Sequence, residues 1–268
     1  MNRRQRGEIV YLTFGCLEEM PGLVHAVSTR QGGVSVAPFD SLNLGLHVGD
    51  EARAVLENRR RFTSAVGFAL EDVVTTRQVH GREVRVVTSA DRGCGASEEP
   101  ERSWSCDALV TRDGGIFLTG FSADCPLVML ADVEAGILGL AHAGWRSAFA
   151  GILQRTVSAM TRLGADVSRV VAGISPAIGP CCYEVSPRLR DAAPADVDNP
   201  GRFFREHAGR FLFDLPRFCR EVLRDCGIGG ESIESAELCT RCGSETMFSY
   251  RASGGRTGRH AGVIGWVR

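Results

Sequence analysis

The sequence predicts a single domain of the α+β or layered α/β class. Three observations lead to this prediction. Short runs of β-branched and apolar residues outnumber the segments with helical periodicity, and only two or three such segments interrupt the strands. No linker-like segment separates two halves of the chain. The 268 residues, of which 44% are apolar, are enough to bury a full core, so we expect residues 1–268 to form one domain.

The N-terminal half is expected to contain loops and short strands around one helix. Residues 26–50 are rich in glycine and polar residues, which predicts loops between short strands. Residues 50–68 have apolar side chains at helical spacing and an acidic first turn, which predicts a helix. Segment 72–88 is rich in β-branched residues on both sides of Gly81, which predicts two short strands. Segment 90–105 is polar, and we expect it to be a loop and the stretch most prone to disorder.

The C-terminal half is expected to alternate strands with two helical segments. Residues 147–164 form the clearest amphipathic helix, with Ser147 as its N-cap and Gly164 as its C-cap. Residues 199–227 predict a loop, an extended segment and a second helix. Strands are expected at 106–111, 115–125, 232–240 and 261–267, and at the start of 169–185 before a Gly/Pro loop.

Charge and composition exclude several classes of protein. The formal net charge is −1, so no strong field would recruit nucleic acid or an anionic membrane. No apolar run reaches the ~18 residues that a membrane span needs. The apolar stretch after the basic N-terminus is short and carries Glu8, which argues against a signal peptide. Without such a signal, ten cysteines predict a reduced cytoplasmic chain, which we expect to be a monomer or a weak homodimer.

All 31 basic residues are arginine, and the chain contains no lysine. This excludes a Schiff-base lysine for pyridoxal phosphate and the lysine of a P-loop. An anionic substrate must therefore be held by arginine, by backbone N–H groups or by a helix N-terminus. The absence of lysine equally fits a bias in genome composition.

A predicted hairpin places a cysteine near a histidine. Residues 126–132 and 137–142 predict two strands joined by a tight turn. In an antiparallel hairpin, the residue numbers of paired positions add up to a nearly constant sum. A turn centred near residue 134 makes this sum about 268, so Cys125 would lie opposite residue 142 or 143. Opposed residues share a face with Cβ atoms ~5 Å apart, which suits two ligands of one metal ion. A register shift of one residue would put the two side chains on opposite faces.

His80 is the best third ligand among the six histidines, because it ends a predicted strand within a polar cluster. His80, Cys125 and His142 would form a His₂Cys set with an open fourth position, which suits catalytic Zn²⁺. Two other interpretations remain open. The cysteine can be a small buried residue beside histidines with satisfied core hydrogen bonds, or Cys125 and His142 can form a thiolate–imidazolium dyad of a cysteine hydrolase.

Eight motifs of this chain resemble those of the YfiH-like, laccase-domain family and occur in the same order as in that family. They cover the chain from about residue 25 to its end: "SLNLGLHVGD" (41–50), "ENRRR" (57–61), "RQVHG" (77–81), "CDALVT" (106–111), "ADCPLVMLAD" (123–132), "GLAHAGWRS" (139–147), "GPCCYEV" (179–185) and "FSYR…GRTGRHAGVI" (248–264). The resemblance implies one domain of layered mixed sheets with helices outside, the YfiH/CNF1-like fold of putative cysteine hydrolases. It also implies a zinc site formed by His80, Cys125 and His142.

The resemblance implies three competing activities. Members are called multicopper polyphenol oxidases, purine nucleoside phosphorylases that also deaminate adenosine and cleave methylthioadenosine, and factors that remove L-Ser from peptidoglycan precursors. A four-copper oxidase needs more histidines than the six of this chain, so laccase activity is not expected and copper bound here would be adventitious. We expect a zinc-dependent purine nucleoside phosphorylase with adenosine deaminase activity. The alternative is a cysteine-type amidase that edits L-Ser-containing peptidoglycan precursors.

Four residues are candidates for binding a purine nucleoside and phosphate. Phosphorolysis needs anchors for the ribose hydroxyls and a site for the phosphate anion. Asn43 suits the ribose hydroxyls, and Arg59 suits the phosphate or the ribose. Arg146 follows His142 by four residues and precedes a predicted helix N-terminus, where phosphate can bind. Gln78 should share a strand face with His80 and orient a ligand or the base.

Two further candidates concern proton transfer and the remaining cysteines. Deamination of adenosine needs a carboxylate beside the attacked carbon, and Asp124 or Glu184 would supply it. The cytidine-deaminase motif is missing, since "HGRE" contains one residue too many. The pairs Cys181–Cys182 and Cys239–Cys242 suit a second zinc site, but simple burial is favoured because the pairs lie far apart in the sequence. A non-enzymatic interaction module would not be expected to bring the candidate polar residues together.

Overall fold

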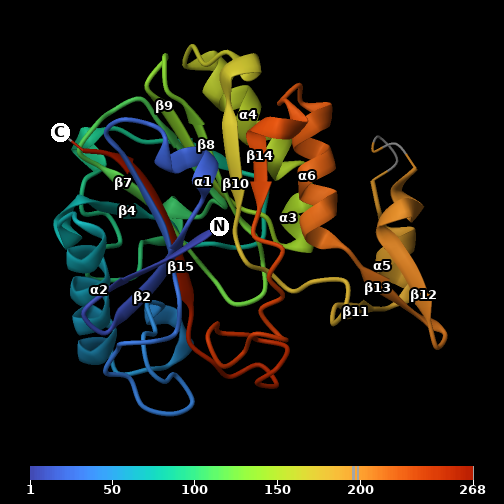
Figure 1. Cartoon of the computed structure of the whole chain (residues 1–268), viewed down its shortest axis with the longest axis horizontal. Helices are drawn as coiled ribbons and strands as arrows, with labels where there is room; N and C mark the ends of the chain where they lie inside the picture. The colour runs from blue at the N-terminus through green and yellow to red at the C-terminus, as the bar shows by residue number, and fades with distance from the viewer. Residues whose placement is uncertain (195–196, 198, 268) are drawn as a thin grey trace.

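The computed structural model describes residues 1–194, 197 and 199–267 of the chain. Most strands belong to two six-stranded sheets (Figure 1). The first sheet has the order β1 (Asn2–Arg6), β2 (Ile9–Thr13), β3 (Leu23–Ser28), β15 (His260–Trp266), β7 (Phe117–Ser122), β4 (Val73–Thr75). The second has the order β14 (Ile233–Ser235), β10 (Val171–Ile174), β8 (Leu127–Asp132), β9 (Ile137–His142), β6 (Ala108–Thr111), β5 (Val84–Val86). Both sheets are mixed, since β4–β7, β10–β14 and β5–β6 pair in parallel and the other neighbours are antiparallel.

A small third sheet and the helices complete the structure. The small sheet has the order β11 (Glu184–Val185), β13 (Arg210–Phe213), β12 (Phe204–His207), and with α5 it projects from one side of the molecule (Figure 1). The α-helices are α1 (Gly15–Glu18), α2 (Ala52–Val66), α3 (Trp145–Phe149), α4 (Ile152–Arg162), α5 (Pro187–Asp191) and α6 (Leu215–Asp225). Short 3₁₀ turns occupy η1 (Leu46–Val48), η2 (Leu70–Asp72), η3 (Ser89–Asp91), η4 (Arg102–Trp104), η5 (Val167–Arg169), η6 (Pro200–Phe203) and η7 (Gly230–Ser232). None of these described helices is long and apolar enough to cross a membrane.

Three apolar clusters define the layers. The cluster between the two sheets combines Leu118 and Ile264 of the first sheet with Met129 and Leu140 of the second. The packing there is so close that a Cβ atom on Gly262 would lie 3.0 Å from atoms of Leu127 and Met129. Side chains of α4 and α6 cover the other face of the second sheet, and side chains of α2 cover the other face of the first. The order of layers is therefore α2, first sheet, second sheet, and α4 with α6, which confirms the predicted class of layered mixed sheets flanked by helices.

Two predictions about local structure are wrong. Residues 147–164 are not one helix, because Gly151 has φ +84° and separates α3 from α4. Ser147 lies inside α3 and its buried hydroxyl has no hydrogen-bond partner, while Gly144 is the N-cap. Gly164, with φ +110°, follows the last helical turn as expected. Segment 90–105 was expected to be disordered, but it is a folded loop in which Ala96 is buried.

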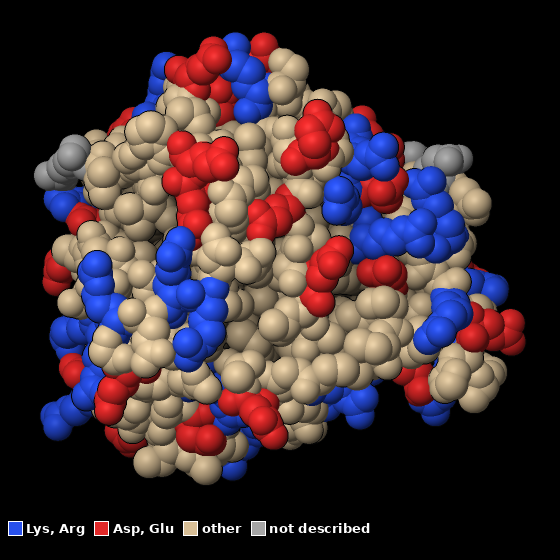
Figure 2. All heavy atoms as spheres, in the orientation of Figure 1, with Lys and Arg blue, Asp and Glu red and all other residues tan. Residues whose placement is uncertain are grey.

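Charged groups do not form one continuous basic surface on the visible face. Figure 2 shows arginine side chains interspersed with aspartate and glutamate over the sheets and helices. This distribution agrees with the formal net charge of −1. On this face of the described residues it provides no stripe of positive charge along which a nucleic acid backbone would bind.

Two buried histidines should make the protein sensitive to acid. Burial lowers the pKa of His25 from 6.5 to about 4, and burial together with Arg259 lowers the pKa of His260 to about 3. As the pH falls below about 6.5, these two histidines therefore become protonated in the unfolded chain while they stay neutral in the folded chain. Each pKa unit corresponds to about 1.4 kcal/mol, so we expect the free energy of unfolding to decrease by several kcal/mol between about pH 6.5 and about pH 4.

Chemical denaturation at several pH values measures this loss. His25→Gln should flatten the decrease, because glutamine keeps an acceptor for the hydrogen bond that the backbone N–H of Phe14 donates to His25 and does not titrate. His207→Gln, on the exposed strand β12, is the matched control and should keep the wild-type slope. An unchanged slope in His25→Gln would show that His25 is not responsible.

Candidate active site

Cys125 lies at a bend between the two sheets. The chain leaves β7 of the first sheet at Ser122 and enters β8 of the second at Leu127. Between them, Asp124 adopts φ +93°, a conformation that non-glycine residues rarely adopt. The side chain of Asp124 fixes this bend by accepting hydrogen bonds from the Thr240 hydroxyl (2.6 Å) and the Arg251 backbone N–H (2.7 Å). The Cys125 sulfur is therefore directed by the bend rather than by a strand.

The hairpin confirms the predicted strands but corrects their register. Strands β8 and β9 are antiparallel, and His142 lies opposite Leu127, so paired positions sum to 269 rather than 268. Cys125 is consequently not the cross-strand partner of residue 142 or 143. The thiol of Cys125 nevertheless lies beside His142, because the bend at Asp124 turns it toward the end of β9.

Asp107 organises the two histidines and was missed by the sequence analysis. It directly precedes β6, and its buried carboxylate accepts hydrogen bonds from the backbone N–H groups of Val79 (3.1 Å), His80 (3.0 Å) and Gly81 (2.6 Å). It also accepts one from His142 Nδ1, at 2.9 Å. His80 itself has φ +58°, a conformation that these bonds stabilise. The only signal in the sequence was an acidic residue at the edge of a buried apolar strand.

The pKa values of the site are mutually dependent. Burial favours the neutral acid of Asp107, but the hydrogen bond and charge of His142, with the N–H groups of Gly81 and Val79, hold its pKa below the ordinary value. Burial also opposes ionisation of Cys125, but the charge of His142 and hydrogen bonds from both histidines lower the pKa of the thiol. In the same way Cys125 and Asp107 raise the pKa of His142 above its ordinary value, against the effect of burial. The site thus favours a thiolate beside its histidines.

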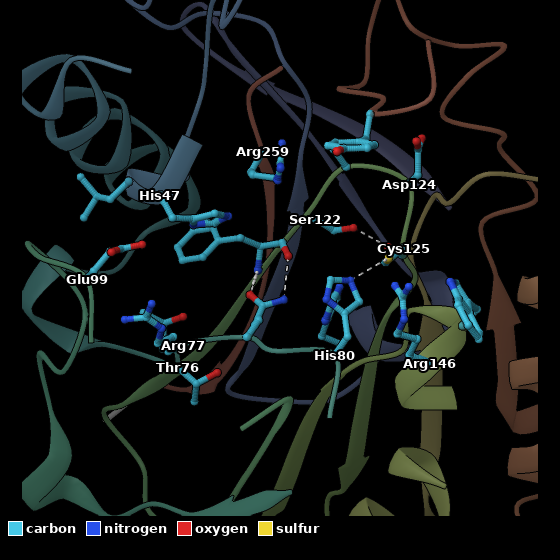
Figure 3. A pocket seen from close by; sticks show the side chains of 18 of the residues that line it. His47, Thr76, Arg77, His80, Glu99, Ser122, Asp124, Cys125, Arg146 and Arg259 are labelled. Atoms are coloured by element: carbon cyan, nitrogen blue, oxygen red, sulfur yellow. Dashed lines mark hydrogen bonds between the residues drawn. The ribbon is translucent and has the colours of Figure 1, made fainter. Parts of the chain in front are cut away.

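The three predicted ligands converge. The Cys125 sulfur lies 3.9 Å from His80 Nε2, and the two imidazole rings have centroids 4.8 Å apart (Figure 3). One ligand atom from each of His80, Cys125 and His142 can be chosen so that all lie within 4.8 Å of one another. The bond to Asp107 occupies Nδ1 of His142 and leaves Nε2 for a ligand. The group can therefore hold a metal ion.

The three side chains open into a pocket of about 650 Å³, a volume typical of sites for small organic ligands. Its lining includes the aromatic residues Phe121, Trp145, Tyr183 and Tyr250 and the cations Arg59, Arg77, Arg146, Arg251 and Arg259. Burial, together with the nearby arginines Arg259 and Arg59, lowers the pKa of His47 in the same pocket to about 4. Three carboxylates, those of Glu98, Glu99 and Asp124, also line the pocket, so its five arginines leave an excess of positive charge that suits a strongly polar ligand with an anionic group.

Arg146 has the most available guanidinium among the predicted binding residues. It lies in α3 and lines the pocket next to Cys125 in Figure 3. Its guanidinium packs over the Trp145 ring at 4.5 Å, and none of the described residues forms an ion pair with it. Because α3 has only five residues, the predicted contribution of a helix N-terminus is small, and the arginine side chain itself provides the positive charge.

Arg59 and Gln78 line the pocket but are held by the backbone. Arg59 is 5% exposed and donates to the carbonyl oxygens of Leu44, Gly95 and Ala96 while it covers the Phe121 ring. The Gln78 amide donates to the Phe121 carbonyl and accepts from the Phe121 N–H. Both side chains therefore fix the walls of the pocket.

Asn43 is not among the residues that line the pocket. Its side chain is fully buried and accepts hydrogen bonds from the backbone N–H groups of Gly45 and Arg259, while its amide donates to the Asp50 carboxylate. Asn43 thus acts on the pocket through Arg259. Glu184, a candidate carboxylate from the sequence, forms an ion pair with Arg210 on the small sheet and is not part of the lining either.

Sequence comparisons find related proteins over almost the whole chain. The family described as multi-copper polyphenol oxidoreductase laccase matches residues 24–267. The chain is 39% identical over 249 residues to "Purine nucleoside phosphorylase YlmD" of Geobacillus stearothermophilus, covering 91% of this chain and 90% of the relative. It is 36% identical over 246 residues to "Purine nucleoside phosphorylase YfiH" of Escherichia coli, covering 92% and 94%.

Solved structures show the same fold. The crystal structure of YfiH from Bacillus licheniformis superposes with a TM-score of 0.91 at 31% identity, covering 98% of both chains. That of YlmD from Geobacillus stearothermophilus gives a TM-score of 0.89 at 35% identity, covering 99% of both chains. The layered arrangement thus belongs to a known type of structure.

Proposed function

Because this chain belongs to the laccase-domain family of YfiH- and YlmD-type purine nucleoside phosphorylases, we propose that it splits purine nucleosides with phosphate in the pocket beside Cys125. The observation that carries this proposal is the guanidinium of Arg146, with which none of the described residues forms an ion pair, in a pocket that also contains the His80, Cys125 and His142 group. We propose inosine, adenosine and S-methyl-5′-thioadenosine as the nucleosides, which would make the enzyme a transferase of the ribosyl group to phosphate.

The metal of the site is proposed to be Zn²⁺. A zinc ion with bonds of about 2.3 Å to sulfur and about 2.05 Å to nitrogen needs the two ligand atoms about 3.6 Å apart, close to the 3.9 Å between Cys125 and His80. Two imidazoles and one thiolate are borderline-soft ligands that leave one coordination position open. The Asp107 carboxylate accepts a hydrogen bond from Nδ1 of His142. A histidine that binds a metal through one ring nitrogen usually donates a hydrogen bond of this kind from the other. Bound zinc would supply a Lewis acid next to the substrate.

The protein side chains would bind and orient the two substrates. Arg146 would hold the phosphate as a charge-assisted hydrogen-bond donor. Tyr183 lines the pocket, and burial raises the pKa of its phenol, so the hydroxyl stays protonated and can donate to the purine or the ribose. Arg59 and Gln78 would hold Phe121 in place in the wall of the pocket. Asn43 would help to position Arg259, which also lines the pocket. These roles use positioning and charge, the main requirements of ribosyl transfer.

Deamination of adenosine is proposed as a second activity of the same pocket. It requires a carboxylate that can transfer a proton beside the attacked carbon. Asp124 is the candidate because it lines the pocket next to Cys125, while Glu184 does not, and to transfer a proton it would have to release its hydrogen bond to Thr240 or to the Arg251 N–H. Since deamination consumes water rather than phosphate, this activity should persist when phosphate is removed.

Replacing Arg146 with alanine should raise the KM for phosphate or lower kcat about ten- to a hundredfold, because one charge-assisted contact contributes about 1.5–3 kcal/mol. Inosine cleavage with and without phosphate, followed by identification of ribose 1-phosphate, measures this effect. Arg155→Ala on α4 is a matched control, since Arg155 is exposed and is not part of the lining. Formation of free ribose without phosphate would contradict phosphorolysis, and an unchanged phosphate dependence in Arg146→Ala would contradict the role of this residue.

One observation favours a second candidate function. Cys125, His142 and Asp107 form a chain of thiol, imidazole and carboxylate that resembles the arrangement of a cysteine hydrolase. Such an enzyme would cleave an amide, as in a peptidoglycan precursor that contains L-Ser. The metal-free protein separates the two candidates. An amidase of this kind should retain its activity without metal, whereas nucleoside cleavage at a zinc site should stop.

A further inference from the structure

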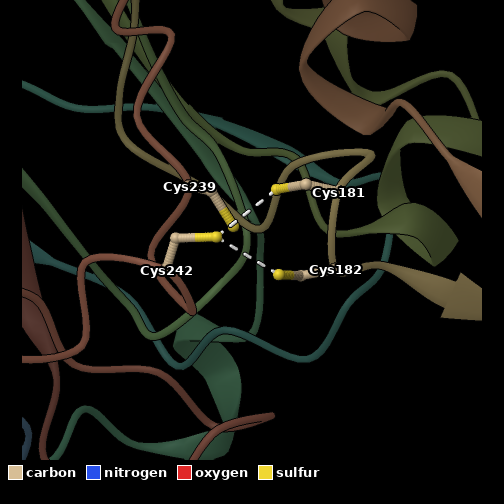
Figure 4. A group of neighbouring side chains, drawn as sticks. All are labelled: Cys181, Cys182, Cys239 and Cys242. Atoms are coloured by element: carbon tan, nitrogen blue, oxygen red, sulfur yellow. Dashed lines mark hydrogen bonds between the residues drawn. The ribbon is translucent and has the colours of Figure 1, made fainter.

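Four cysteines outside the pocket come together from two distant parts of the chain. Cys181 and Cys182 follow β10 in the Gly/Pro loop, and Cys239 and Cys242 lie in the loop between β14 and β15. The sulfurs of Cys181 and Cys182 lie 3.6 Å and 3.4 Å from the sulfur of Cys242, and Figure 4 shows all four side chains directed to one centre. All four sulfurs lie within 4.8 Å of one another. About 60 residues of sequence separate the two pairs, and the fold brings them together.

We propose that Cys181, Cys182, Cys239 and Cys242 bind a structural Zn²⁺ ion as four thiolates, separate from the ion of the pocket. A tetrahedral centre with zinc–sulfur bonds of about 2.3 Å places its sulfurs about 3.8 Å apart. The two measured distances are close to this value, and they far exceed the ~2.05 Å of a disulfide bond. Four protein ligands leave no open position, as in structural rather than catalytic zinc sites.

The backbone around these cysteines is arranged to support thiolates. The Gly179 N–H donates to the Cys239 sulfur at 3.3 Å, and the nearby N–H groups of Arg241 and Cys242 also favour a negative charge on it. The Cys239–Cys242 segment forms a tight turn closed by a bond from the Gly243 N–H to the Cys239 carbonyl (2.9 Å). A C-x-x-C turn with N–H groups near its sulfur atoms commonly supplies two of the four ligands of a structural zinc site.

The opposite pair is held by a second turn. The backbone N–H of Cys182 donates to the Gly179 carbonyl at 3.0 Å, so that two adjacent cysteines can reach one centre. The Arg241 guanidinium lies close enough to the Cys182 sulfur for their charges to interact. A positive group beside four thiolates offsets part of the negative charge that the zinc centre would carry.

The proposed ion would join two loops that also reach the pocket. Ala177 pairs with Cys239, and the Thr240 N–H donates to the Ala177 carbonyl at 3.0 Å. The Thr240 hydroxyl in turn holds the carboxylate of Asp124 at the bend before Cys125. Zinc at the four cysteines would therefore fix the turn on which the position of Cys125 depends.

Metal analysis of the full-length protein purified under reducing conditions tests the proposal. The wild-type protein should contain two zinc ions per chain, and Cys242→Ser should contain one. Cys181→Ser should give the same result, which guards against a defect particular to one variant. Cys226→Ser at the end of α6 is the matched control and should keep both ions, because Cys226 is remote from both groups.

Spectroscopy of the cobalt-substituted protein gives a second readout. Co²⁺ bound by four thiolates should show intense thiolate charge-transfer bands and tetrahedral d–d bands, which Cys125→Ser should retain and Cys242→Ser should lose. Loss of zinc from the cysteines should also lower the midpoint of thermal unfolding. Wild-type protein with a single zinc that Cys242→Ser retains would overturn the proposal, as would a Cys182–Cys242 disulfide or iron in place of zinc. Because these readouts do not use nucleosides, they are independent of the proposed catalytic function.

Discussion

Replacing Cys125 with serine should abolish nucleoside cleavage and remove one zinc ion from each chain. Serine has nearly the size of cysteine, but its hydroxyl is neither ionised near neutral pH nor a soft ligand. The remaining histidines, His80 and His142, provide too few ligands for a tight site. Because a bound metal contributes several kcal/mol to stabilising developing charge, we expect kcat/KM to fall at least about a thousandfold. Metal analysis and steady-state kinetics with inosine measure the two effects.

The control for this variant is Cys226→Ser, which should leave metal content and activity unchanged. Circular dichroism and the midpoint of thermal unfolding show whether each variant is folded. A folded Cys125→Ser protein that keeps the full zinc content would show that Cys125 is not a ligand. Loss of activity with full zinc content would instead support a catalytic thiol.

Replacing Asp107 with asparagine should weaken the metal site and the fold together. Asparagine keeps the shape of the side chain but loses the negative charge, and its NH₂ group would face N–H donors of residues 79–81 or of His142. An outer partner of a ligating histidine contributes about 10–100-fold to metal affinity, and kcat/KM should fall by a similar factor. Breaking one partner of a buried, hydrogen-bonded pair should lower the free energy of unfolding by about 3 kcal/mol.

Asp132 offers a matched control for this experiment. It is also a buried carboxylate at a strand end of the second sheet, and it accepts hydrogen bonds from the Ala135 and Asp166 backbone N–H groups and from Arg169. Asp132→Asn should therefore lower stability to a similar extent but leave metal affinity unchanged. Equal losses of metal affinity in the two variants would contradict a specific role of Asp107, and recovery of Asp107→Asn activity by added zinc would support it.

The sequence predicted which side chains converge better than it predicted their surroundings. Residue types and spacing singled out His80, Cys125 and His142, whose ligand atoms lie within 4.8 Å of one another, and their role as metal ligands stays a prediction. The register was wrong by one position, and Cys125 reaches His142 only through the bend at Asp124, which depends on contacts with Thr240 and Arg251, more than 100 residues away. Asp107 could not be identified, because a carboxylate that binds several distant N–H groups has no periodic signal. Arg59 and Gln78 were found as pocket residues, but their hydrogen bonds to the backbone became visible only in three dimensions.

The fold was predicted at the level of layers, and the errors are local. Apolar periodicity continues through residues 147–164, so it could not reveal that Gly151 adopts a left-handed conformation and divides the helix. Segment 90–105 was judged by its polar composition, yet the Arg59 guanidinium donates to two of its carbonyl oxygens. The four cysteines were too far apart in the sequence to predict one site, and contacts between their loops, such as the pairing of Ala177 with Cys239 and the bond from the Gly179 N–H to the Cys239 sulfur, bring them together.

The hairpin of β8 and β9 gives the three ligands unequal freedom of motion. Every residue of these two strands is buried, because the second sheet has one apolar cluster on each face. Amides in such strands exchange with solvent only when the whole domain opens. Cys125 and His142 lie together at the open end of this hairpin, whereas the exposed His80 lies in the connection between β4 and β5 and is held in place mainly through Asp107. Local opening should therefore begin at His80, and an ion would enter or leave through a gap on that side while its other two ligands stay in place.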